Sequence, residues 1–309
     1  MQKLKGLIAA PFTPMFEDGS LNMGMIAPYA AKLKKDGLNG VFVCGTTGEG
    51  MLMTPDERMA VAEQWVEEQT PDFKVIVHVG TTSYTQSKDL AKHAQKIGAS
   101  AVGCMGPIFL KPENVDNLIR FCIEVAAGAP ELPFYYYHIP TVSGVWLSMT
   151  DFLEKAQWAI PNLAGIKFTH GNMMEMLQCI RVDNGKWDIL NGFDEQLLCG
   201  LSVGVEAAVG STFNYMATLY RNLIGAFQKG DIERARDLQF QSVRFIDILI
   251  RHGGGVIGGK PVMKMIGLDC GPLRAPARNL STAEFKQYEK ELNEIGFFEW
   301  CENGKLTER

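Results

Sequence analysis

Short apolar runs alternate with amphipathic stretches along most of the chain. The apolar runs are nearly continuous, which is typical of parallel strands that are covered on both faces. We expect such strands at residues 6–10, 40–44, 74–79, 101–105, 133–138, 163–168, 188–191 and 206–209.

The stretches between these runs have helical periodicity, and several carry helix start signals. We expect helices at residues 55–68, 83–97, 112–126 and 149–156. Pro55 and Pro112 stand where the first turn of a helix tolerates proline, and Thr54 is a candidate N-cap. Repeated strand–helix units in a chain of this length predict a (β/α)8 TIM barrel. A doubly wound sheet is the alternative, but it requires a dinucleotide fingerprint or a comparable site, and the sequence shows neither.

The pattern becomes purely helical after residue 209, with helices expected at residues 215–228, 231–251, 262–266 and 281–295. We therefore predict a barrel core at residues 1–214. Residues 215–309 would form the last barrel helix and additional C-terminal helices, within a single domain overall. The glycine-rich segment 254–260 resembles the start of a P-loop, but Pro261 follows where Ser or Thr is needed, so we expect a glycine-rich turn there.

Composition excludes several classes of protein. The 309 residues are 46% hydrophobic, which is enough for a large core, and the net charge is −5. The Lys and Arg residues are scattered, unlike the basic footprint of a nucleic-acid-binding protein. No apolar stretch approaches the length of a membrane span, and the N-terminal apolar run is too short for a secretion signal.

Cysteine and histidine spacing adds to this picture. The 7 cysteines are widely spaced, which favours buried thiols in a reducing cytoplasm over disulfides. The 5 histidines show no spacing that predicts a metal site.

One charged residue interrupts an apolar run. Lys167 lies in the segment 163–169, where burial of its amine costs free energy unless the amine is paired or loses its proton. A lysine made partly neutral can form an imine with a carbonyl. The alternative is a lysine at the barrel rim that extends its ammonium group into solvent. Its place near the carboxyl end of the sixth strand favours the first interpretation, because barrel active sites are built at that end.

The preceding strand ends in three consecutive tyrosines. Because side chains alternate along a strand, Tyr135 and Tyr137 share one face and Tyr136 takes the other. If Lys167 points inward, Tyr137 could stand beside it at the same height and relay protons. The alternative is an ordinary strand aromatic.

Small polar residues follow the second strand. Thr46 and Thr47 lie between Gly45 and Gly48, a pattern that also occurs in ordinary turns. Hydroxyls and backbone N–H groups that converge in such a loop can hold a carboxylate.

Polar residues also follow the seventh and eighth strands. Gly192, Asp194 and Glu195 come after the seventh, and Gly210 and Ser211 come after the eighth. Acidic residues before a helix are usually caps, so both a capping role and a role in a binding site stay open. Several polar loops at the carboxyl ends of strands nevertheless indicate a common site.

The motifs resemble those of a known family. Gly-Thr-Thr-Gly-Glu at 45–49, Tyr-x-Ile-Pro at 137–140 and Gly-Ile-Lys at 165–167 are similar to the N-acetylneuraminate lyase and dihydrodipicolinate synthase family of pyruvate-dependent aldolases. The resemblance covers essentially the whole chain. It implies a (β/α)8 barrel with extra C-terminal helices, usually assembled as a homotetramer, that acts without a metal or an organic cofactor.

The resemblance also implies roles for individual residues. Lys167 would form the imine with pyruvate, and Tyr137 would relay protons. Thr46 and Thr47 would hold the pyruvate carboxylate, with Thr47 joining the relay. Many members place a tyrosine from a neighbouring subunit after the fourth strand, but Phe109 or Leu110 stands there in this sequence and cannot extend the relay.

Within the family, the sequence is most similar to the sialic-acid-cleaving branch. The synthase branch places an arginine two residues after the proline of its tyrosine motif, where this chain has Val142. By similarity to that sialic-acid-cleaving branch, the residues that would contact the sugar chain are Thr169, Gly192, Asp194, Glu195, Gly210 and Ser211.

The expected reaction is therefore the reversible cleavage of N-acetylneuraminate to N-acetylmannosamine and pyruvate. The expected partners are these small molecules, without nucleic acid or membrane. The alternatives are a dihydrodipicolinate synthase, another sugar-acid lyase or dehydratase of the family, and a non-catalytic sugar-binding barrel.

Overall fold

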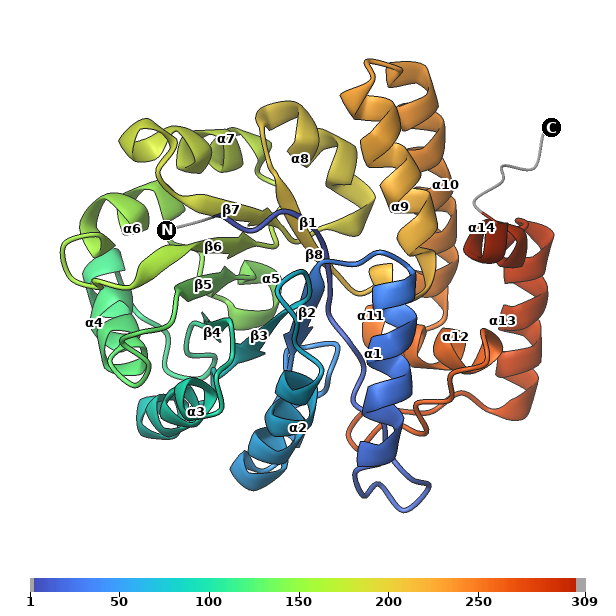
Figure 1. The fold of residues 1–309 in the computed structure, drawn as a ribbon, viewed down its shortest axis with the longest axis horizontal. Coiled ribbons are helices and arrows are strands. Elements are labelled where there is room, and N and C mark those ends of the chain that lie inside the picture. Colours follow the sequence, from blue (N-terminus) through green and yellow to red (C-terminus); the bar gives the residue numbers. More distant parts are fainter. Residues whose placement is uncertain (1–2, 304–309) are drawn as a thin grey trace.

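Eight parallel strands pair in sequence order and close into a barrel (Figure 1). The computed structural model describes residues 3–303, without the side chains of residues 302 and 303. The strands are β1 (Gly6–Ala9), β2 (Gly40–Val43), β3 (Lys74–His78), β4 (Ala101–Met105), β5 (Phe134–His138), β6 (Leu163–Phe168), β7 (Asp188–Asn191) and β8 (Ala207–Gly210). The predicted fold class is confirmed, and each expected strand is present within a residue of its predicted limits.

Helices connect the strands and surround the barrel (Figure 1). They are α1 (Ile26–Lys35), α2 (Pro55–Glu67), α3 (Tyr84–Lys96), α4 (Val115–Ala126), α5 (Pro140–Ser143), α6 (Met149–Ala156), α7 (Met173–Arg181) and α8 (Leu197–Val203). Short 3-10 turns are η1 (Met23–Met25), η2 (Gly50–Leu52), η3 (Val182–Gly185) and η4 (Asp194–Gln196).

Capping residues determine where several of the helices begin. Thr54 is the N-cap of α2, as predicted, and it also forms a capping box with Glu57. The expected start of a helix at Pro112 is wrong. α4 begins at Val115, because the Asn114 side chain accepts a hydrogen bond from the Asn117 N–H and so caps the helix there.

The C-terminal part is helical and packs against the barrel. It comprises α9 (Phe213–Gln228), α10 (Ile232–Arg251), α11 (Gly254–Ile257), α12 (Gly259–Met265), α13 (Thr282–Glu294) and α14 (Phe297–Asn303). The expected glycine-rich turn at 254–260 is wrong, because α11 and the start of α12 occupy it. Phe245, Tyr288 and Trp300 of this part belong to the same buried cluster as the barrel strands, which supports our proposal that 1–214 and 215–309 form a single domain.

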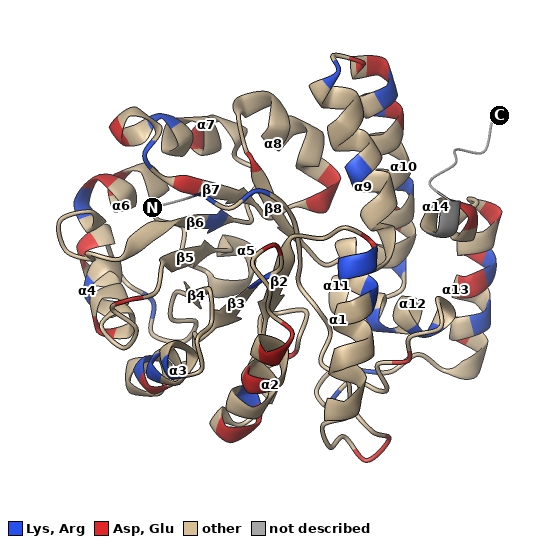
Figure 2. Cartoon of the chain, viewed as in Figure 1, with Lys and Arg blue, Asp and Glu red and all other residues tan. Residues whose placement is uncertain are grey.

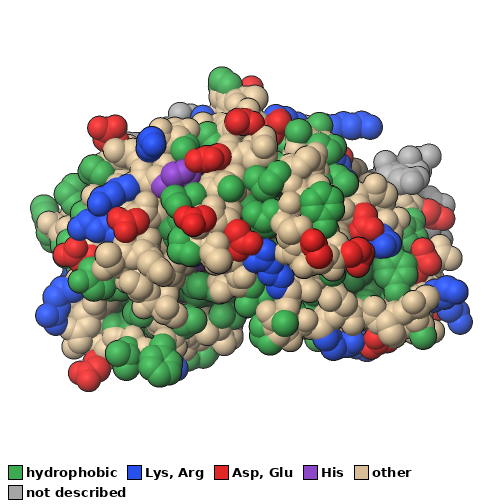
Figure 3. Space-filling model, turned by 90° about the horizontal axis from the view of Figure 1, so that it is seen from below, with side chains coloured by type: hydrophobic (Ala, Val, Ile, Leu, Met, Phe, Trp, Pro, Cys, Tyr) green, Lys and Arg blue, Asp and Glu red, His purple; other side chains and the backbone are tan. Residues whose placement is uncertain are grey.

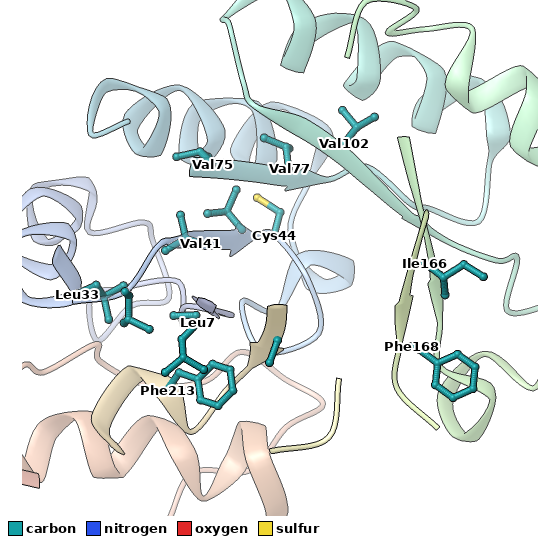
Figure 4. Packing of buried hydrophobic residues seen from close by; sticks show 14 of the residues in the cluster. Leu7, Leu33, Val41, Cys44, Val75, Val77, Val102, Ile166, Phe168 and Phe213 are labelled. Carbon is teal, nitrogen blue, oxygen red and sulfur yellow. The ribbon is translucent and has the colours of Figure 1, made fainter. Parts of the chain in front are cut away.

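Alternation along each strand separates two layers of side chains. One layer lies between strands and helices and includes Val41, Val75, Ile166 and Phe168 (Figure 4). The other fills the barrel interior. Tyr136 belongs to the outer layer, whereas Tyr135 and Tyr137 belong to the inner one, as the alternation predicts.

One glycine is required by strand packing in β6. A Cβ on Gly165 would lie 1.8 Å from the Asp188 carbonyl oxygen of β7, a backbone atom that cannot rotate away. Glycine at this position therefore permits the pairing of β6 with β7, and that pairing places the following residues of β6 in register with β7.

Charged residues lie mainly on the outer helices, with both signs interspersed (Figure 2). The face in Figure 3 likewise shows acidic, basic and hydrophobic side chains side by side. No helix within residues 3–303 combines the length and the apolar character that crossing a bilayer would require.

Candidate functional site

A pocket opens at the carboxyl ends of the strands. Its volume is ≈ 300 Å³, at the lower end of the range of small-molecule sites. Every site residue predicted from the sequence lines it, namely Thr46, Thr47, Tyr137, Lys167, Thr169, Gly192, Asp194, Glu195, Gly210 and Ser211. The carboxyl ends of β2, β5, β6, β7 and β8 thus supply one common cavity.

Lys167 points into the barrel interior, between Ile166 and Phe168, which point outward. Its amine nitrogen lies 4.0 Å from the ring centre of Tyr137 and 4.2 Å from that of Phe42. The residue is 5% exposed, and among residues 3–303 no carboxylate forms an ion pair with it. Aromatic faces thus offset part of the cost of burying this amine, and its nitrogen has no hydrogen-bond partner among the residues that the structure describes.

Tyr137 stands beside Lys167 because the two residues are paired in register between β5 and β6. Its ring packs edge-to-face on Phe42 and on His78. Tyr135, on the same face, lies deeper and donates its hydroxyl to Asp188 over 2.8 Å. Of the two inward tyrosines, Tyr137 is therefore the one at the height of the amine.

The loop that carries Thr46 and Thr47 is unusually constrained. It begins at Cys44 and ends at Glu49, and both residues have left-handed backbones, with φ of 57° and 55°. A Cβ on Gly50 would lie 1.9 Å from the Cys44 carbonyl oxygen. The two threonines therefore lie in a compact loop that has strained backbone at both ends and is followed by a glycine without room for a Cβ.

Asp194 is held by its neighbours at the other side of the pocket. Its Oδ2 accepts bonds from the Thr212 N–H (2.8 Å) and hydroxyl (2.6 Å). Burial raises the pKa of Asp194, and the two bonds from Thr212 oppose that change. The Thr212 hydroxyl also contacts Tyr220, whose hydroxyl contacts Ser242. This buried network fixes the position of the carboxylate.

Two glycines leave room for polar side chains at the pocket wall. A Cβ on Gly210 would lie 2.0 Å from the Asp194 Oδ1, and a Cβ on Gly192 would lie 1.9 Å from the Thr169 Oγ1. The Thr169 hydroxyl is buried and has no hydrogen-bond partner among the described residues, so it is available to a ligand. Burial, followed by the nearby Asp194, raises the pKa of Glu195.

The sequence pattern missed one wall of the pocket, which comes from the C-terminal helices. Ile246, Leu249 and Ile250 of α10 line it, together with Gly255 and Val256 of α11. The amphipathic pattern of α10 indicates a buried face, but it does not indicate that this face reaches the barrel mouth.

His78 was also missed, since no motif surrounds it. It is buried, and burial lowers its pKa well below the usual range, helped by Arg58 and Lys167. Its Nδ1 lies 3.2 Å from the Cys44 carbonyl oxygen, and its Nε2 lies 3.3 Å from the Met105 N–H nitrogen. A neutral ring satisfies both contacts, because it donates to the carbonyl and accepts from the amide. His78 therefore joins the ends of β2, β3 and β4 beneath the pocket.

Within the described part of the chain, no group of three or more His, Cys, Asp or Glu side chains is arranged to hold a metal ion. The chemistry available in the pocket comes from the amine, the phenol, the hydroxyls and the carboxylates. The fold and this set of groups define a (β/α)8 barrel equipped for Schiff-base chemistry.

Comparisons with known proteins give the same class. The profile of the Dihydrodipicolinate synthetase family matches residues 3–295. The chain is 40% identical over 303 residues to an N-acetylneuraminate lyase of Sus scrofa, covering 96% of this chain and 95% of that protein. It is 39% identical over 305 residues to the N-acetylneuraminate lyase of Homo sapiens, covering 97% and 95%.

A solved structure agrees with these sequence matches. The Proteus mirabilis N-acetylneuraminate lyase superposes with a TM-score of 0.93 at 40% identity, covering 96% of this chain and 100% of that one. The chain therefore belongs to the dihydrodipicolinate synthetase family, and it is a carbon–carbon lyase of the aldolase type.

His138 follows Tyr137 but lies on the outer side of β5, against Phe168 and His170. It is buried, and neither ring nitrogen has a hydrogen-bond partner among the described residues. Burial, and secondarily His170, lower the pKa of His138 to about 3. In the unfolded chain this pKa returns to about 6.5. Below that pH the unfolded state therefore binds a proton that the folded state does not bind.

Stability should accordingly fall with acidification, and His138→Phe should weaken that dependence. Between pH 7 and pH 5 the wild type should lose about 2 kcal/mol more of its free energy of unfolding than the variant. Urea unfolding at the two pH values measures this difference. Parallel losses in the two proteins would contradict the assignment of a neutral, buried His138.

Proposed function

We propose that this chain cleaves N-acetylneuraminate reversibly to N-acetylmannosamine and pyruvate, through an imine on Lys167. The observation that carries the proposal is the buried amine of Lys167, which lies over the Tyr137 ring and has no ion-pair partner within residues 3–303. The proposal is supported by the similarity of the chain to the N-acetylneuraminate lyases of Sus scrofa and Proteus mirabilis, each at 40% identity.

The steps follow from the groups in the pocket. The Lys167 amine attacks the ketone of the open-chain sugar acid, and loss of water gives an iminium. A base then takes the proton of the C4 hydroxyl, the C3–C4 bond breaks, and its electron pair moves into the iminium. N-acetylmannosamine leaves, and the remaining enamine takes up a proton at carbon. Hydrolysis by water then releases pyruvate and restores the amine.

Tyr137 is the proposed proton carrier, because its ring lies against the Lys167 amine. Thr46 and Thr47, at the same pocket, are proposed to hold the substrate carboxylate, and Thr47 to join the relay. Acid–base help of this kind contributes a factor of about 10² to 10⁴. The electron sink is the iminium, so the proposed reaction calls for neither a metal nor an organic cofactor.

The sugar end is proposed to lie against the opposite wall. Hydroxyl and acetamido groups need donors and acceptors, which this wall offers in Thr169, Asp194, Glu195 and Ser211, with Gly192 and Gly210 leaving room for them. Since Asp194 Oδ2 is already bonded to Thr212, the second oxygen, Oδ1, is the one we assign to the sugar.

The synthase alternative is disfavoured by Val142. This residue lies in α5 and is 53% exposed, and it offers no charge for a second substrate carboxylate. A carboxylate that enters a largely dry site needs a paired cation, preferably a bidentate arginine. We therefore propose a polyhydroxylated aldehyde, rather than an acidic one, as the partner of pyruvate.

We propose a homotetramer in the cytoplasm as the working form. Phe109 and Leu110, in the β4–α4 connection, are 85% and 80% exposed, and Trp146 is 64% exposed. Exposure of large apolar side chains to water is unfavourable, and this supports the proposal that they are buried against another subunit. The cysteines form no disulfide within residues 3–303, in keeping with a reducing compartment.

The direct test of the function is a substrate panel. The protein should release pyruvate from N-acetylneuraminate and should not condense pyruvate with aspartate semialdehyde. Asp194→Ala should raise the KM for N-acetylneuraminate by about tenfold or more, since one buried acceptor is lost, while the KM for pyruvate in the reverse direction changes little. Asp237→Ala, an exposed change on α10, is the control. Efficient turnover of the semialdehyde would favour the synthase instead.

Tyr137→Phe should retain pyruvate binding and lose turnover by a factor of about 10² or more, because one hydroxyl is removed and ring packing is kept. Tyr136→Phe is a matched control: the neighbouring hydroxyl is buried on the outer side of the strand without a partner among the described residues. Steady-state kcat with both variants provides the measurement. A kcat near wild type in Tyr137→Phe would assign Tyr137 to the core alone.

A further inference from the structure

A buried ion pair joins the threonine loop to the C-terminal helices. The Lys260 amine of α12 lies 2.8 Å from the Glu49 Oε1, and each side chain is 1% exposed. The two residues are 211 positions apart in the sequence. Glu49 is the last residue of the loop that carries Thr46 and Thr47.

Each charge of this pair has a second partner from the same C-terminal segment. The Glu49 Oε2 accepts a bond from the Arg274 backbone N–H over 2.9 Å, and the Lys260 amine donates to the Pro272 carbonyl over 2.6 Å. Burying two charges costs free energy, which is offset only when such additional bonds are present. The arrangement therefore fixes Glu49 against residues 260 and 272–274 at once.

The backbone of the loop requires an external hold. Glu49 and Cys44 both adopt left-handed conformations that are unfavourable for residues other than glycine. Such conformations persist where the surroundings over-determine them, and they concentrate at functional sites. His78 contacts the Cys44 carbonyl at one end of the loop, and Lys260 holds Glu49 at the other.

We propose that Glu49 and Lys260 are positioning residues for substrate binding. The pair holds the loop in the one conformation that presents the Thr46 and Thr47 hydroxyls to a carboxylate, so the C-terminal helices form part of the keto-acid site without touching the keto acid. The inference rests on the proposed function, because the carboxylate is that of the keto acid. The pair thus sets the affinity for pyruvate more than the affinity for the sugar.

The test uses Lys260→Met and the double variant Glu49→Gln/Lys260→Met, with Lys264→Met as the matched control. Lys264 lies on the same helix, but its pair with Asp269 is half-exposed and does not reach the loop. Lys260→Met leaves the Glu49 carboxylate buried without its cation and should lose stability. The double variant removes both charges and should remain folded, which circular dichroism and urea unfolding monitor.

In condensation assays, the double variant should show a KM for pyruvate about tenfold higher than wild type, because the carboxylate contacts are misplaced. The KM for N-acetylmannosamine should not change, and Lys264→Met should match wild type in both constants. A pair that is only structural would lower stability and leave the ratio of the two KM values unchanged, which would overturn the inference. Absence of turnover in wild type would contradict the proposed function instead, so the two failures are distinguishable.

Discussion

Parallel pairing of the strands in a fixed register is the constraint on which the site depends. A closed parallel barrel brings the carboxyl ends of all its strands to one rim, and the period of two decides which side chains face inward. The register that pairs Tyr137 with Lys167 places phenol and amine at the same height. A shift of one residue in β6 would turn Lys167 out among the helices and bring Ile166 or Phe168 into the pocket.

Polar groups buried at the pocket need hydrogen bonds or ion pairs from the protein in place of those that water would provide. Two carboxylates are held in this way by residues of other elements: Asp194, in the pocket wall, by Thr212, and Glu49, at the end of the threonine loop, by Lys260. These bonds offset the cost of burying the charges, and they also leave little freedom for the groups that would meet a substrate. Lys167 differs from both, because its amine lies over two aromatic rings and forms no ion pair within residues 3–303. A carboxylate partner would stabilise the protonated ammonium form, which has no lone pair with which to attack a carbonyl.

Much of this architecture could be predicted from the sequence, because its signals are local. The strands of a covered parallel sheet are continuous apolar runs, and a cap such as Thr54 marks its own helix start. The positions of Lys167 and Tyr137 followed from the same strand pattern. Pro112 misled the prediction, because a proline is tolerated at a helix start but does not create one, whereas the Asn114 cap does.

What the sequence could not indicate depends on contacts between distant segments. The apolar wall from α10 and α11 lines the pocket only after the C-terminal helices have packed against the barrel rim. The left-handed backbones of Cys44 and Glu49 carry no glycine signal, and the ion pair of Glu49 with Lys260 joins residues with no common motif. His78 is similar, because its ring nitrogens contact the backbone of two other segments, at Cys44 and at Met105.

If Lys167 is the nucleophile, its imine with pyruvate can be trapped by reduction. The protein is incubated with pyruvate and borohydride, digested, and mapped by peptide mass. We expect one reduced pyruvate adduct, on the peptide that contains Lys167, and no adduct on the folded Lys167→Ala variant. An adduct on another lysine, or none while the protein binds the sugar acid, would contradict it. The last outcome would leave a sugar-binding barrel without this chemistry.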